Sequence, residues 1–220
     1  MNKVKTHVFK WLGGYIILLI IIAISVGLHY VKRSMAYEAV ADEGILQVAT
    51  WILLLISCVF CLLQVFIQKA NKVKWAVGSF VLLIYAMREM DLHRAFTQEH
   101  VSKLKFYLGP YPWQEKVIAG IIMILTGLAL LYLVVSSLID FWKGLKKRTP
   151  WTFYIFLWAI CLFGAQILDK SRWNELFTEI VIEESMEFGA ALIIFVIIWQ
   201  VACSCCCKKK LEVNQEYPMA

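Results

Sequence analysis

The chain is poor in charge and lacks the usual marks of a soluble enzyme. Of its 220 residues, 17% are charged and 61% are hydrophobic. It contains no phosphate-binding glycine loop, no local Ser-His-Asp signature and no separate soluble catalytic segment. None of its long apolar runs carries the buried histidine pair that bis-imidazole haem ligation uses. These absences argue against nucleotide-binding, serine-hydrolase and haem functions.

What the chain has instead is apolar surface, in a larger amount than one soluble core of this length can enclose. A helix needs about 17–25 residues to cross a hydrocarbon core of about 30 Å. We therefore predict an all-α fold, a polytopic membrane helix bundle with six transmembrane helices. Their approximate ranges are 11–29, 45–67, 73–90, 117–139, 151–168 and 177–202. The first run is longer than the apolar part of a secretory signal, so we interpret it as a retained helix.

Basic residues accumulate on one side of this predicted bundle. With a cytoplasmic N-terminus, the inner segments carry a net charge of +10 and the outer ones −4, which together give the overall +6. The positive-inside rule then predicts N-in/C-in topology. The positive charge is accounted for by attraction to anionic lipids of the inner leaflet and gives no reason to expect a nucleic-acid partner. The bilayer is the expected partner.

No repeat or linker divides the chain, so we expect a single six-helix transmembrane domain over 1–202 and a cytoplasmic Cys/Lys-rich tail over 203–220. Cys58, Cys61 and Cys161 fall inside spans, where small packing residues are common. The tail cluster Cys203–Cys207 stands beside three lysines and is consistent with a reduced interfacial stop sequence. Soft-metal binding or acylation of that cluster remain alternatives.

The last span contains an unusual row of acids. Glu179, Glu183 and Glu187 recur every four residues, and Glu184 widens the row to roughly 140° of the helix surface. Charged groups at this depth are rare unless they are buried in the bundle or hydrated. Unpaired carboxylates so close together require protons, cations or counter-charges. The row therefore predicts a polar site inside the bundle.

Counter-charges are available at the same predicted depth, in "REMDLH" at the end of the third span. Arg88 and Asp91 are three residues apart, and Glu89 and His93 are four apart, so each pair shares a helix face. Arg172 follows the fifth span on the same outer side. We expect an acidic cavity in the outer half of the bundle, lined by the third, fifth and sixth spans.

The leading functional prediction is binding of protons or of a divalent cation, coupled to transport or sensing. Clustered carboxylates with an imidazole suit Mg or Mn, and also Zn or Fe, whereas closely spaced acids can hold and relay protons. Glu183 and Glu187 are the principal candidates, and Arg88 and Arg172 would balance their charge. The other candidate ligands are Glu184, Glu89, Asp91 and His93.

A second interpretation rests on motif order. Ser25-x-x-x-His29, then Asp91, then Glu183-x-x-x-Glu187 resembles the Ser-x-x-x-His, Asp, His-x-x-x-His order of the alkaline ceramidase and adiponectin receptor superfamily. The resemblance implies a metal-dependent lipid hydrolase with Ser25, His29, Asp91 and His93 near the reacting centre. The chain departs from that family because glutamates replace the last two zinc-binding histidines, and because six spans replace seven.

A third interpretation is an assembly subunit whose buried ion pairs are structural. The residues leave open whether the protein is an enzyme. Its compact size and short loops favour a bacterial inner (plasma) membrane, and so small a bundle makes a homodimer a reasonable expectation.

Overall fold

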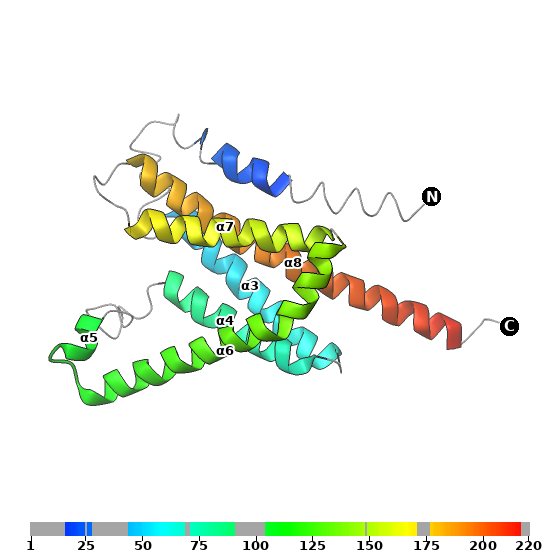
Figure 1. Ribbon diagram of the computed structural model, residues 1–220, viewed down its shortest axis with the longest axis horizontal. Coiled ribbons are helices and arrows are strands. Elements are labelled where there is room, and N and C mark those ends of the chain that lie inside the picture. Colours follow the sequence, from blue (N-terminus) through cyan, green and yellow to red (C-terminus); the bar gives the residue numbers. More distant parts are fainter. Residues whose placement is uncertain are drawn as a thin grey trace.

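The computed structural model describes residues 16–24, 26–27, 44–68, 71–90, 104–147, 149–170 and 177–216. Side chains are described throughout these ranges except at 104–105, 150, 169–170, 177–179 and 203–216. Within the described residues every regular element is a helix and none is a strand (Figure 1). This confirms the all-α prediction.

The helices follow the predicted apolar runs closely. The second and third runs form α3 (Ile45–Ile67) and α4 (Lys72–Glu89). The last three lie within α6 (Trp113–Lys146), α7 (Pro150–Lys170) and α8 (Phe177–Glu216), and a short α5 (Leu104–Leu108) precedes α6. Residues 16–24 and 26–27, inside the first predicted run, are also helical.

Three of the described helical segments are long and apolar enough to cross a membrane: α3, α6 and Trp151–Leu168 of α7. They identify a membrane protein. The other two long helices, α4 and α8, carry charged residues near their ends. In α4 the charges are Lys72 and Lys74 at the start and Arg88 and Glu89 at the end, and in α8 they are the glutamates of the first turns.

Successive long helices run antiparallel, and α8 lies between α7 and α3 (Figure 1). In turn α3 packs against α4, and α4 against α6, which connects back to the start of α7. The start of α3, the end of α4 and the start of α8 meet at one end of the bundle, as the contacts of Gln47 with Glu89 and of Leu46 with Val181 show. We call this the Glu89 end.

Besides the small cluster of Leu46 and Val181, two larger apolar clusters form the core of the described residues, and α8 contributes to all three. One joins the N-terminal helical residues, α7 and α8 around Ile21, Tyr154 and Ile193. The other joins α3, α4 and α8 around Leu54, Ala86, Ala191 and neighbouring residues. Cys58 and Cys61 belong to the second cluster and Cys161 to the first, all as buried free thiols. Their prediction as packing residues is confirmed.

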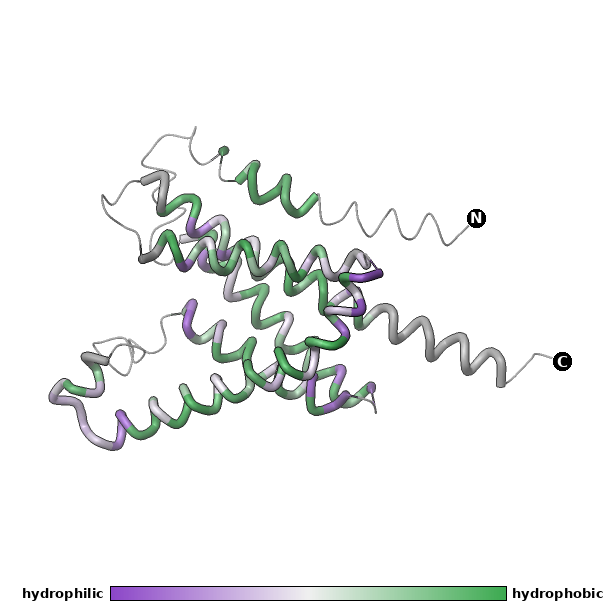
Figure 2. The backbone as a smooth tube through the Cα atoms, in the orientation of Figure 1, coloured by the Kyte–Doolittle hydropathy of each residue, from purple (hydrophilic) through white to green (hydrophobic). Residues whose placement is uncertain are grey.

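Helix α6 is the least buried part of the bundle. Only Ala119 and Gly144 of its 34 residues are buried, although apolar side chains line most of its length (Figure 2). Lys74 of α4 holds it by donating to the Ser136 carbonyl at 2.7 Å and by lying 3.9 Å from the Asp140 carboxylate. An apolar helix exposed on most sides is stable in lipid but not in water, which agrees with the membrane assignment.

Close approach of α8 to the N-terminal helical residues depends on Gly189. A Cβ atom built at this position would lie 2.4 Å from Cδ1 and 2.8 Å from Cγ1 of Ile21. Small residues allow such contacts between membrane helices, where packing rather than water exclusion drives association. Ser185, one turn earlier, is also fully buried, so a small-residue stripe faces inward here.

We expect Gly189→Val to destabilise the protein by about 1–3 kcal/mol, because the added side chain overpacks the contact with Ile21. Thermal unfolding in detergent would show a midpoint several degrees lower. Gly127→Val in α6 is the matched control, since a Cβ there meets nothing within 4 Å. Equal midpoints for the two variants would contradict the proposed contact.

Candidate functional site

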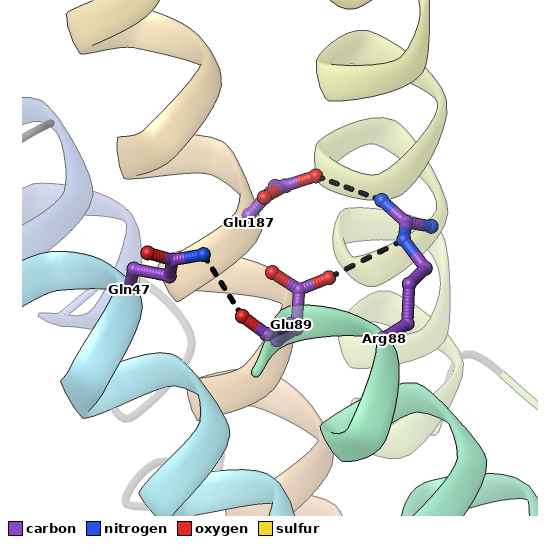
Figure 3. Close-up of polar contacts among 4 residues, drawn as sticks. All are labelled: Gln47, Arg88, Glu89 and Glu187. Atoms are coloured by element: carbon purple, nitrogen blue, oxygen red, sulfur yellow. Dashed lines mark hydrogen bonds and ion pairs between the residues drawn. The ribbon is translucent and has the colours of Figure 1, made fainter. Parts of the chain in front are cut away.

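The end of α4 brings two charged residues to the Glu89 end of the bundle. Arg88 lies in the last turn, where a cation interacts favourably with the helix dipole. Glu89 is the final helical residue, and its backbone carbonyl has no further turn to bond. The Gln47 side chain, in the first turn of α3, donates to this carbonyl with an Nε2–O distance of 2.8 Å (Figure 3). α3 therefore fixes the end of α4.

Arg88 lies between two carboxylates from different helices (Figure 3). Its Nη2 is 3.3 Å from Oε1 of Glu187 on α8, and its Nε is 3.6 Å from Oε1 of Glu89. The two glutamate side chains are only 10% and 6% exposed, whereas that of Arg88 is 49% exposed. The guanidinium thus connects two buried acids to the surface of the bundle.

A third acid lies one helical turn earlier on α8. Glu183 is 6% exposed, and Glu184 beside it is partly buried. Ser185, between these acids and Glu187, donates its hydroxyl to the Val181 carbonyl at 2.7 Å, so its hydrogen is already engaged within the helix. We name Arg88, Glu89, Glu183 and Glu187 the acidic cluster. Its formal charge is −2 when every carboxyl group is ionised.

Tyr85 also contacts Arg88. The guanidinium carbon lies 5.2 Å from the centroid of the Tyr85 ring, one turn earlier on α4, which is a cation–π arrangement. Neither Tyr85 nor Gln47 was predicted from the sequence. The three-residue spacing of Tyr85 and Arg88 could have indicated the first contact, but no sequence signal joins Gln47 to Glu89, 42 residues away.

Of the residues predicted from sequence, the structure brings Arg88, Glu89 and Glu187 into contact and buries Glu183 on the same helix as Glu187. Glu184 is partly buried on the same helix, and the structure does not describe the other candidate residues. Asp91, His93, Ser25, His29 and Arg172 lie outside the described residues, so their roles remain predictions. The same holds for the hydrolase centre, which depends on four of them.

The fit of a divalent metal can be tested on the described donors. Within the ranges that the structure describes, no group of three or more His, Cys, Asp and Glu side chains converges as a metal site would require. The guanidinium of Arg88 already contacts the carboxylates of both Glu89 and Glu187, so a cation bound by both acids would compete with it. A metal at this cluster would therefore have to displace Arg88 and recruit further ligands.

No protein-family model, curated protein or solved structure matches the chain. The function is therefore argued from the acidic cluster.

We expect Gln47→Ala to destabilise the protein by about 1 kcal/mol, because the Glu89 carbonyl loses its side-chain donor at the end of α4. Chemical or thermal unfolding in detergent measures the loss. Gln114→Ala, at an exposed position in the first turn of α6, provides the control and should change little. A Gln47→Ala protein as stable as the control would show that this hydrogen bond does not hold α4.

Proposed function

We propose that the protein binds a proton, or alternatively a divalent cation, at the acidic cluster and couples this binding to transport or to a sensing step. The observation that carries the proposal is the convergence of buried Glu89 and Glu187, from different helices, on one guanidinium. Buried Glu183 adds a third acid to the same face of the bundle.

Charge balance favours a bound ion or proton. Burying a carboxylate in an apolar environment is costly unless a counter-charge or hydrogen bonds compensate. Glu89 and Glu187 share the single positive charge of Arg88, so these three side chains carry a net charge of −1 when both acids are ionised. A proton removes one of these charges and needs no new space or ligands. Because a metal would have to displace Arg88, the proton is the favoured ligand.

Coupling follows from the positions of the acids on two helices. The ion pair between Arg88 and Glu187 joins α4 to α8, and a proton on Glu187 would weaken that attraction. A ligand shifts a conformational equilibrium only when it interacts differently with the two states. A proton on Glu187 would interact differently with two packing states of α4 and α8, because it changes the electrostatic attraction between these helices. The predicted consequence is a change in how these helices pack.

For the whole protein we propose six membrane-spanning helices with N-in/C-in topology, in a bacterial inner (plasma) membrane. The support is that α4 runs antiparallel to α3 and α6, and α8 antiparallel to α7, within one bundle, so that α4 and α8 extend along the apolar helices (Figure 1). In this topology the Glu89 end faces outward. The acidic cluster would then exchange ligand with the outer side through the half-exposed Arg88.

A purely structural role is the competing function, because the two ion pairs of Arg88 also fix α4 relative to α8. The two functions differ in the state of the acids. A structural pair needs only ionised partners for Arg88, whereas a proton site must contain a carboxyl group that gains and loses a proton in the folded protein.

Infrared difference spectroscopy during a pH titration separates these functions, because a protonated carboxyl group has its own carbonyl band. We expect a titrating band in the wild type that is lost or shifted in Glu187→Gln. Glu115→Gln, in the first turn of α6 and away from the cluster, should leave that band unchanged. A wild type with no band sensitive to Glu187→Gln would contradict proton binding. Tight Mn²⁺ binding that disappears in Glu187→Gln would select the divalent cation.

A further inference from the structure

Tyr85 carries a polar group that the packing of the bundle does not explain. Its ring packs beside the apolar cluster of α3, α4 and α8 and lies under the guanidinium of Arg88. Its hydroxyl oxygen is buried and has no hydrogen-bond partner in the part of the chain that the structure describes. A phenylalanine would fill the same apolar space without this polar group.

Burying a hydroxyl group without a partner costs free energy, and most such groups in folded proteins are bonded to protein or to ordered water. An unpartnered hydroxyl in an apolar pocket therefore indicates a water molecule or a bound group beside it. For Tyr85 the nearby polar groups are those of the acidic cluster. Arg88, which contacts the carboxylates of Glu89 and Glu187, has its guanidinium carbon 5.2 Å from the centroid of the Tyr85 ring.

The chemistry of these groups is complementary. A tyrosine hydroxyl donates one hydrogen bond, and an ionised carboxylate accepts several. One water molecule can join a donor and an acceptor that do not touch, with little loss relative to a direct hydrogen bond. Arg88 contacts the carboxylates of Glu89 and Glu187 and also lies over the Tyr85 ring. The same side chain therefore lies next to the tyrosine and to the two acids.

We propose that Tyr85 is a positioning residue of the proton site, whose hydroxyl orders a water molecule that donates to the Glu89 and Glu187 carboxylates. The inference rests on the proposed function and adds the residue that tunes it. The hydroxyl stabilises the ionised acids, because the water that it orders is a hydrogen-bond donor to them. It transfers no proton itself. Arg88 still contacts both carboxylates when the hydroxyl is removed.

The test is Tyr85→Phe, read as the pH midpoint of the carboxyl band that depends on Glu187. With one donor lost, the ionised form is less stable and the proton is held more tightly. We expect the midpoint to rise by about half to one pH unit, or about three- to tenfold in proton affinity. Tyr132→Phe, exposed on α6, is the matched control and should not move it. An unchanged or lowered midpoint in Tyr85→Phe would overturn the inference.

A second measurement needs no variant. In wild-type protein with ring-deuterated tyrosine, the phenol vibrations of one tyrosine should change as the carboxyl band titrates. Phenol bands that stay constant through that titration also overturn the inference. If the wild type has a carboxyl band sensitive to Glu187→Gln but Tyr85→Phe leaves its midpoint unchanged, only the role of Tyr85 fails. If the wild type has no such band, the proton site itself fails, and the role of Tyr85 with it.

Discussion

The guanidinium of Arg88, held between the carboxylates of Glu89 and Glu187, is the interaction on which this bundle's acidic end depends. It lets α4 and α8 bury acids at the same place without strong mutual repulsion. One guanidinium serves two carboxylates, so the three side chains have a net charge of −1 when both acids are ionised. In the proposed function, a proton on Glu187 weakens the ion pair that joins α4 to α8.

Helix α8 packs against α3 and α4 on one side and against the N-terminal helical residues on another. Towards α4 and α3 its first turns present acids, and towards the N-terminal helical residues the close contact at Gly189 requires a hydrogen in place of a side chain. The same helix supplies residues to both apolar clusters. A shift of α8 caused by a change in the charge of Glu187 would therefore change the packing of both apolar clusters. By contrast, α6 is joined to α4 through Lys74 and is otherwise largely exposed, so it has little part in that coupling.

The sequence predicted where the long helices lie, because long apolar runs determine their existence, but α6 and α8 extend beyond the predicted runs into charged sequence. It also indicated that Arg88 and Glu187 belong to one site, since few charges occur in spans and those few must find each other. Gln47 was missed because its role arises from a tertiary contact with a carbonyl 42 residues away. Tyr85 was missed because the burial of its hydroxyl without a partner depends on how the helices pack, although its spacing from Arg88 was visible. The sparse packing of α6 was equally invisible, because its hydropathy resembles that of α3. The proposed contributions of Asp91 and His93 remain predictions.

A double-mutant cycle on Arg88 and Glu187 tests the central interaction most directly, with unfolding free energies of the wild type, Arg88→Leu, Glu187→Gln and the double variant measured in one detergent. Removing Arg88 alone leaves buried Glu187 without its counter-charge, so Arg88→Leu should cost about 3–5 kcal/mol at neutral pH. Replacing Glu187 as well should recover part of that loss, giving a coupling energy of about 1–3 kcal/mol. Additive effects, with a coupling energy near zero, would contradict an ion pair between α4 and α8.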